Sequence, residues 1–224
     1  MLQWGARFET LCSVDPRHQT EFPQGFFSRS DESDDAGFYA FDRFVTHIDD
    51  GAIAAVGELY TELGLTGPTS GPVLDLCSSW ISHFPERPER LVVTGMNANE
   101  LAANPMADEW SVRDLNVDPT LPFGDGSFAG VTCAVSIDYL TRPLDVCAEV
   151  ARVLRPGGVF VCTFSNRCFP TKAIRGWLAN DDAGRVRIVE RYLELTDGLD
   201  VPASEHRNPG ARTDPLYAVW ARRT

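Results

Sequence analysis

Two acidic residues and one amide stand where apolar runs of this sequence end. Asp75 lies near the end of the run PVLDLC, Asp114 lies in SVRDL, and Asn97 follows Asp75 by 22 residues. A carboxylate at the end of a buried strand needs a partner, because an unpaired charge is costly to bury. The spacing of Asn97 is close to that of a ribose-binding group in a strand–helix–strand unit, and an amide can both accept from and donate to hydroxyls. These residues predict recognition of a small polar ligand.

The elements that must position these residues are predicted from apolar periodicity. The predicted strands are residues 72–77, 90–96, 111–115, 130–136, 158–165 and 216–221. Several are nearly continuous apolar runs, which is typical of strands covered on both faces. Helical spacing is seen at 144–154 and 184–195, and Thr46 with Asp49 resembles a capping box that starts a helix ending at Gly64. Alternating strands and helices predict an α/β domain with a mainly parallel sheet and helices on both faces.

Ligands of an open parallel sheet bind beyond the carboxyl ends of its strands. The residues that leave the predicted strands are therefore the candidates for binding. They are Asp75, Ser78, Ser79, Trp80, Met96, Asn97, Asp114, Leu115, Ser136, Tyr139, Asn166 and Arg167.

The first part of the chain differs from the rest. We expect residues 1–36 to form an N-terminal arm or lid, and residues 37–224 to form the α/β domain. Within the arm, the acidic run DESDD at 31–35 is predicted to be a solvated turn, while three phenylalanines at 22, 26 and 27 can pack.

Charge and composition exclude several classes of function. The chain has 224 residues and a formal net charge of −12. So acidic a surface repels phosphate backbones and anionic lipids, which argues against general nucleic-acid or membrane-surface binding. A hydrophobic content of 43% is ordinary for a globular domain and argues against disorder of the whole chain.

The cysteines and histidines predict no metal centre. None of the six cysteines is spaced as CxxC, and the four histidines form no HExxH motif. Three of the cysteines lie within apolar runs, which indicates buried thiols in a reducing compartment. The chain shows neither a signal peptide nor an apolar run long enough for a membrane span. A cytoplasmic protein is expected.

Five segments together resemble a known family. They are VLDL at 73–76, VTGMNANEL at 93–101, RDLN at 113–116, LPFGDGSFAGVTCAVSIDYL at 121–140 and EVARVLRPGGVFVCTFSNR at 149–167. They resemble the class I S-adenosylmethionine-dependent methyltransferases, type 11-like. The segment FYAFDRFVTHID at 38–49 is similar to a subset in which a Ser-Ser turn replaces the glycine-rich loop. The resemblance implies a Rossmann-like sheet of seven strands, S-adenosylmethionine as cofactor, and methyl transfer to a small acceptor by in-line displacement.

The resemblance also implies roles for individual residues on the cofactor side. Asp75 would orient the ammonium group of the methionine moiety, and Ser78, Ser79 and Trp80 would line that moiety. Trp80 would attract the sulfonium, since aromatic faces attract cations. The remaining cofactor-binding residues are Met96 and Leu115 against adenine, Asn97 on the ribose, Asp114 on the adenine amine, and Ser136 facing the reacting end.

On the acceptor side, Tyr139 is expected at the reacting end, and His47 is the candidate general base for an acceptor hydroxyl or protonated amine. If the N-terminal segment covers the pocket, Tyr39 and Arg43 would contact the acceptor, and Asn166 and Arg167 would reach it from the loop after the fifth strand. The segment FSNRCFPTK, which includes Lys172, is locally basic and indicates an anionic acceptor.

Structural roles compete with several of these assignments. Asp75 could cap backbone amides, Trp80 and Met96 could be core residues, and His47 could be a helix-start residue with local bonds. The turn after the first strand contains no glycine, and Asn97 replaces an acid, which would weaken cofactor binding by about 1–2 kcal/mol.

Two alternative functions therefore stay open. One is a non-catalytic binding module that keeps the fold with a degenerate cofactor site. The other is a nicotinamide-dependent dehydrogenase, which would need G-x-G-x-x-G where this chain has CSSWIS.

Overall fold

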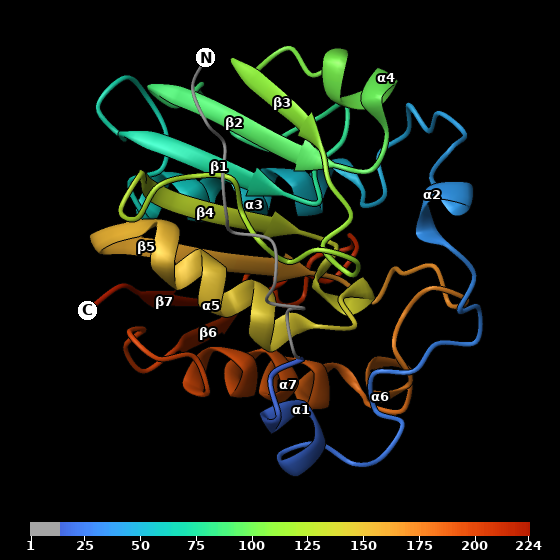
Figure 1. Ribbon diagram of the computed structural model, residues 1–224. Coiled ribbons are helices and arrows are strands. Elements are labelled where there is room, and N and C mark those ends of the chain that lie inside the picture. Colours follow the sequence, from blue (N-terminus) through green and yellow to red (C-terminus); the bar gives the residue numbers. More distant parts are fainter. Residues whose placement is uncertain (1–13) are drawn as a thin grey trace, which may run out of the picture.

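The computed structural model describes residues 14–224, and its centre is one sheet of seven strands (Figure 1). The strands are β1 (Pro72–Leu76), β2 (Arg90–Gly95), β3 (Glu109–Val112), β4 (Phe128–Ala134), β5 (Leu154–Phe164), β6 (Ala203–His206) and β7 (Tyr217–Arg222). Their order is β3-β2-β1-β4-β5-β7-β6. The pairs among β1 to β5 are parallel, whereas β7 is antiparallel to β5 and β6 to β7. The expected mainly parallel, Rossmann-like sheet is confirmed.

Helices cover both faces of the sheet. They are α1 (Arg17–Thr20), α2 (Asp35–Phe38), α3 (Asp50–Glu62), α4 (Ala98–Ala102), α5 (Pro143–Val153), α6 (Arg175–Leu178) and α7 (Asp182–Glu194), with a 3-10 turn at Ile137–Tyr139. Figure 1 shows α5 and α7 in front of the sheet and α3 behind it. Each face has its own apolar core, one containing residues of α5, α6 and α7 and the other containing residues of α3 and α4.

Alternation along each strand supplies both cores. In β5, Phe160 and Cys162 pack into the core beneath α5, while Val159 and Val161 pack into the core beneath α3. Successive side chains of a strand point to opposite faces, so a strand covered on both sides must be apolar throughout. This is why the predicted strands are continuous apolar runs.

Several predicted boundaries need correction. The third strand lies at Glu109–Val112 rather than 111–115, and the polar residues of RDL follow it as a loop. Helix α3 begins at Asp50, and the Asp49 side chain accepts a hydrogen bond from the backbone N–H of Ala52 at 2.9 Å. Asp49 is thus the N-cap itself, and Thr46 starts no capping box. The helix ends as expected, since Gly64 has a φ of +74°.

The described part of the N-terminal arm packs on the domain. Phe22 belongs to the core beneath α5 and α7, and its ring centroid lies 5.6 Å from that of Tyr192. The prediction of a fully solvated acidic turn is wrong for Asp35, which is 7% exposed because Arg29 and Lys172 pair with it. Helix α2 runs across residue 36, and the division of the chain at that residue stays a prediction.

The carboxyl ends of the central strands and the N-terminal segment meet at one edge. The arrows of β1, β2 and β4 point toward the side on which α2 lies (Figure 1). The strand order reverses between β1 and β4, which is where parallel sheets leave room for a ligand.

Candidate functional site

A cavity of about 310 Å³ lies at the carboxyl edge of the sheet. This volume is at the lower end of the range typical of small-molecule sites. Its walls come from the ends of β1, β2 and β4, from the loops after β3 and β5, and from the N-terminal segment. Of the residues predicted for the site, those that line it are Tyr39, Arg43, His47, Asp75, Ser78, Ser79, Met96, Asn97, Asp114, Leu115, Ser136, Tyr139 and Arg167.

The turn after β1 is built without glycine. Cys77 has a φ of +52°, a left-handed conformation that costs a non-glycine residue on the order of 1 kcal/mol or more. The backbone N–H of Ser78 donates to the carbonyl of Thr94 at 2.7 Å, which fastens the turn to β2. A Cβ atom on Gly95 would overlap the carbonyl oxygen of Ser78. The glycine that permits close approach therefore lies on the facing strand rather than in the turn.

Asp75 fixes this turn through hydrogen bonds to hydroxyl groups. Its Oδ2 accepts hydrogen bonds from the hydroxyls of Ser78 and Ser82, each at 2.7 Å, and its Oδ1 accepts one from Thr132 at 2.6 Å. The side chain is 4% exposed, and burial raises the pKa of its carboxyl. Because three hydroxyls already engage both oxygens, Asp75 holds Ser78 and Ser82 in place more directly than it could hold a ligand.

The side chain of Asn97 is fully occupied. Its Oδ1 accepts from the backbone N–H groups of Asn99 at 2.9 Å and Glu100 at 3.0 Å, so it caps α4. Its Nδ2 donates to the carbonyl of Tyr39 at 3.1 Å and to Asp42 at 2.9 Å. An amide offers two donors and two acceptor positions, so Asn97 has none left for a ribose.

Glu100 is a cavity residue that the sequence reasoning missed. It lies in α4 and lines the cavity with 8% of its surface exposed. Its Oε1 accepts from the backbone N–H of Arg43 at 2.7 Å, and burial raises the pKa of its carboxyl. The signal that could have found it is an acid three residues after the N-cap Asn97, where a short helix begins at the ligand edge.

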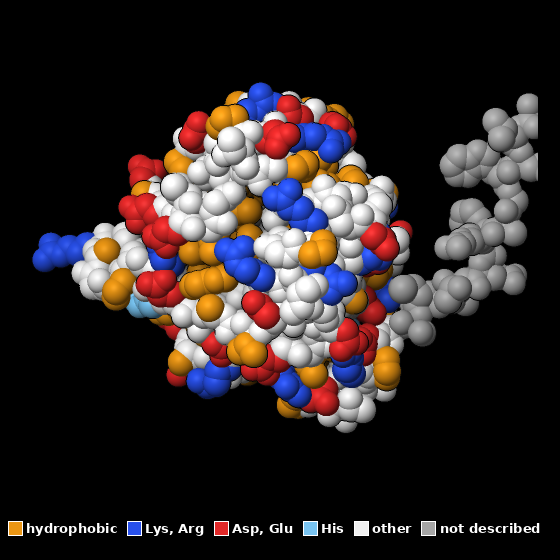
Figure 2. All heavy atoms as spheres, turned by 90° about the vertical axis from the view of Figure 1, so that its left-hand side faces the viewer, with side chains coloured by type: hydrophobic (Ala, Val, Ile, Leu, Met, Phe, Trp, Pro, Cys, Tyr) orange, Lys and Arg blue, Asp and Glu red, His pale blue; other side chains and the backbone are white. Residues whose placement is uncertain are grey.

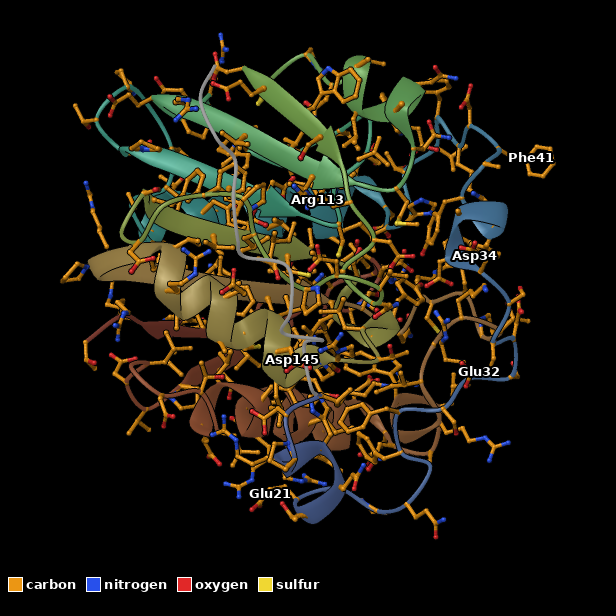
Figure 3. All side chains as sticks on the ribbon, in the orientation of Figure 1. Glu21, Glu32, Asp34, Phe41, Arg113 and Asp145 are labelled. Carbon is orange, nitrogen blue, oxygen red and sulfur yellow. The ribbon has the colours of Figure 1, made fainter. Side chains whose placement is uncertain are left out.

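The loop after β3 carries a second carboxylate to the cavity. Asp114 accepts from the backbone N–H of Asn116 at 2.9 Å through Oδ1, which folds the loop back on itself. Leu115 is 4% exposed, and Arg113, whose position is labelled in Figure 3, is also among the residues that line the cavity. An apolar side chain beside a carboxylate suits a nucleobase, because the apolar group can pack on the flat ring face and the carboxylate can accept from an exocyclic amine.

Aromatic rings form the opposite wall. The ring centroids of His47 and Phe169 are 5.3 Å apart, and those of Tyr139 and Phe169 are 5.9 Å apart. The Arg43 guanidinium lies 4.6 Å from the ring centroid of Phe38 and donates to the Phe38 carbonyl at 2.7 Å. Arg43 thus stabilises the N-terminal segment where that segment forms part of the wall.

His47 and Tyr139 differ in what they can do with a proton. Burial, with the nearby charge of Arg43, lowers the pKa of His47, so its imidazole is neutral at pH 7 and can accept a proton. The Tyr139 hydroxyl accepts from the backbone N–H of Phe169 at 2.8 Å, and burial raises its pKa. Tyr139 therefore stays protonated and positions the loop after β5.

Three residues expected at the site lie elsewhere. The Trp80 indole N–H donates to the carbonyl of Val45 at 3.2 Å, its ring faces Phe44, and it is outside the cavity lining. Asn166 is exposed and also outside the lining.

Lys172, the third, is fully buried and its charge is neutralised. Its Nζ lies 3.1 Å from Asp35 and 3.2 Å from Asp31, and it donates to the carbonyl of Ser33 at 2.8 Å. The prediction that this loop presents Lys172 to an anionic acceptor is therefore wrong. The residues that neutralise it come from the acidic run that was expected to be solvated.

Residues 14–224 contain no group of three or more His, Cys, Asp or Glu side chains arranged to hold a metal ion. They also contain no helix of the length and apolarity needed to span a bilayer. Five cysteines there have free thiols, and Cys12 lies outside the described residues.

Comparison with known proteins gives one family match and one curated relative. Residues 78–162 match the family described as methyltransferase domain. Over 80 residues the chain is 40% identical to ubiquinone/menaquinone biosynthesis C-methyltransferase UbiE from Roseobacter denitrificans. The matched segment is 34% of this chain and 30% of that relative, so the chain spans less than a third of the relative's length.

Solved structures share the fold at low identity. The PH0226 protein from Pyrococcus horikoshii superposes with a TM-score of 0.55 and 18% identity, covering 84% of this chain and 99% of that one. Geranyl diphosphate C-methyltransferase from Streptomyces coelicolor was solved with geranyl diphosphate and S-adenosyl-L-homocysteine. It superposes with a TM-score of 0.53 and 16% identity, covering 76% of this chain and 77% of that one. These likenesses support the seven-stranded, Rossmann-like architecture described above.

Proposed function

We propose that this chain, whose residues 78–162 match the methyltransferase domain family, is a member of that family and transfers a methyl group from S-adenosylmethionine to a small-molecule acceptor. The observation that carries the proposal is the cavity at the reversal point of the sheet. The family match begins at Ser78, in the turn that forms one wall of this cavity. Sequence family and cavity thus coincide on the same elements.

The residues present fit the cofactor. Met96 and Leu115 offer apolar surface for a purine, and Asp114 offers a carboxylate for its amine. The turn at Ser78 and Ser79 offers small side chains and close backbone for the methionine moiety. Trp80 leaves the cavity open, because it is not among the lining residues and its indole N–H donates to the carbonyl of Val45.

The chain's own residues chiefly bind, align and exclude water. S-adenosylmethionine supplies the methyl group on a sulfonium, which is already a good leaving group. Alignment of an acceptor with that methyl group can lower the barrier by up to about 7–11 kcal/mol. His47 is placed to remove a proton from an acceptor hydroxyl or ammonium, since its imidazole is neutral and lines the cavity.

The acceptor would bind against the aromatic wall where the N-terminal segment meets the loop after β5. Tyr39, His47, Tyr139 and Phe169 line the cavity there, and the rings of His47 and Phe169 are in contact, with centroids 5.3 Å apart. Such a wall suits a small acceptor with an apolar or aromatic part. The names of the curated relative and of the structural neighbour differ, one referring to ubiquinone/menaquinone biosynthesis and the other to geranyl diphosphate, so neither name chooses the acceptor of this chain.

Isothermal titration calorimetry with S-adenosylhomocysteine tests the proposal. We expect saturable binding of S-adenosylhomocysteine and no heat from NAD at the same concentrations. Binding of NAD alone would indicate a dehydrogenase. Binding of neither ligand at millimolar concentration would contradict the proposal and leave a non-catalytic module with the same fold.

We further propose a cytoplasmic location without general nucleic-acid or membrane-surface partners. Five free thiols in the described residues suit a reducing compartment. The net charge of −12 opposes binding to phosphate backbones and anionic lipids. On the face at the amino ends of the strands, Asp and Glu are interspersed with Lys and Arg, without one large basic patch (Figure 2).

A further inference from the structure

Four carboxylates line the cavity, and two of them have both oxygens engaged. Asp75 accepts from three hydroxyls, as described above. Asp35 is bonded by Arg29 at 2.8 and 2.9 Å, by Asn116 at 3.0 Å, and is paired with Lys172. Neither carboxylate has an oxygen without a hydrogen bond from a protein group.

The other two carboxylates each keep one oxygen free. Glu100 uses Oε1 for the Arg43 N–H, and Asp114 uses Oδ1 for its own loop. Within residues 14–224, no hydrogen bond reaches Oε2 of Glu100 or Oδ2 of Asp114. The two free oxygens lie at different places along the cavity, one in the helix after β2 and the other in the loop after β3.

We infer that Glu100 binds the ribose hydroxyls of the nucleoside, a role that the sequence analysis assigned to Asn97. The inference rests on the proposed function, since it concerns the same cavity. Asn97 cannot serve without giving up the cap of α4 or its bonds to the N-terminal segment. Glu100 lies three residues further along, in the first turn of the helix that Asn97 caps. A carboxylate oxygen accepts from a vicinal diol more strongly than an amide does.

The position of Glu100 also links the nucleoside to the acceptor side. Its Oε1 accepts a hydrogen bond from the backbone N–H of Arg43, and Arg43 lies between Tyr39 and His47 on the N-terminal segment. A ribose bound to Oε2 would therefore be joined through one carboxylate to the segment that forms the acceptor wall.

Glu100 could instead serve only to fasten Arg43, and the experiment must separate the two roles. We would measure dissociation constants by calorimetry for S-adenosylhomocysteine and for its 2′,3′-dideoxy analogue, with wild type and Glu100→Gln. A ribose-binding carboxylate predicts that wild type prefers the hydroxylated ligand by about tenfold or more. It also predicts that Glu100→Gln removes most of that preference and leaves binding of the dideoxy analogue nearly unchanged.

Two further variants complete the design. Glu109→Gln is the matched control, because Glu109 is 58% exposed on β3 and, within residues 14–224, its one ion pair is with Arg90 at the surface. It should keep the wild-type preference. Glu100→Asp retains the charge on a shorter side chain and should give an intermediate preference, which keeps the test valid if the glutamine variant fails to fold.

The outcomes distinguish this inference from the proposed function. If wild type binds both ligands equally, or if Glu100→Gln weakens both by the same factor, Glu100 does not bind the ribose while the proposed function stands. If wild type binds neither ligand, the proposed function fails, and this inference fails with it.

Discussion

Burial decides how the ionisable side chains near the cavity titrate. Asp138 follows β4, is 3% exposed, and its Oδ2 has no hydrogen-bond partner among the described residues. Burial raises the pKa of this carboxyl to about 7, although a bond from Tyr139 and the charge of Arg185 oppose the rise. Asp138 is therefore largely protonated in the folded protein below neutral pH, where it would be ionised in the unfolded chain.

This shift predicts that Asp138 makes stability depend on pH. The folded state binds the extra proton between about pH 4 and pH 7, so the contribution of Asp138 is greatest below pH 4 and is lost as the pH rises through 7. The upper limit of the loss is about 4 kcal/mol, because each pKa unit corresponds to about 1.4 kcal/mol. Asp138→Asn should flatten the dependence, as urea unfolding at pH 5 and pH 8 would show.

Asp118→Asn is the control, since that side chain is 57% exposed in the loop after β3. This variant should show the same dependence of the free energy of unfolding on pH as wild type. A profile for Asp138→Asn that runs parallel to that of wild type would show that Asp138 is already ionised in the folded protein.

Sequence reasoning at this scale finds positions more readily than orientations. The ends of apolar runs correctly placed Asp75 and Asp114 at the cavity. Asn97 donates a hydrogen bond to Asp42, which is 55 positions away in the sequence. Lys172 forms an ion pair with Asp35, which is 137 positions away. No local pattern shows such partners, so the sequence could not reveal that Asn97 is saturated or that Lys172 is buried.

At the scale of elements, a buried charge cluster attaches the N-terminal segment to the loop before α6. Arg29, Asp35 and Lys172 are each at most 9% exposed, and Asp31 completes the cluster at the surface. Removal of one member of such a cluster leaves an uncompensated charge in the interior, which typically costs about 3–5 kcal/mol. The segment held in this way contributes Tyr39, Arg43 and His47 to the cavity wall.

Lys172→Met should therefore loosen this segment. We expect a loss of about 3 kcal/mol in the free energy of unfolding, together with faster amide hydrogen exchange in residues 29–47, measured by mass spectrometry. The apolar stem of Met keeps much of the lysine packing, so the effect reports mainly on the charge.

Arg90→Met is the matched control, because Arg90 pairs with Glu109 where both side chains are about half exposed. Its cost should stay below about 1 kcal/mol. Unchanged exchange in residues 29–47 of Lys172→Met would show that the charge cluster does not hold the segment.

The elements themselves were predictable where burial is strong. Strands β1, β2, β4 and β5 are apolar on both faces, and their existence follows from composition alone. The edge strands β3 and β6 are short and mostly exposed, so β3 was displaced and β6 was missed. Edge strands lack the apolar pattern because only one neighbour and part of one face are covered.

At the scale of the molecule, the topology brings distant segments to one edge. Parallel strands β1, β2 and β4 deliver their carboxyl ends to the cavity, and the N-terminal segment crosses the same edge (Figure 1). Phe41 of that segment projects away from the molecule, whereas Tyr39 and Arg43 on either side of it line the cavity (Figure 3). The fold therefore forms the two sides of the site from residues far apart in sequence.

A crystal structure of the protein grown with S-adenosylhomocysteine is the most direct test of this account. We predict the adenine against Met96 and Leu115 with its amine at Asp114, and the homocysteine beside the turn at Ser78 and Ser79. Trp80 should keep its bond to the Val45 carbonyl. Density for the ligand at any other surface, or a Trp80 indole that has turned inward to fill the cavity, would contradict the account.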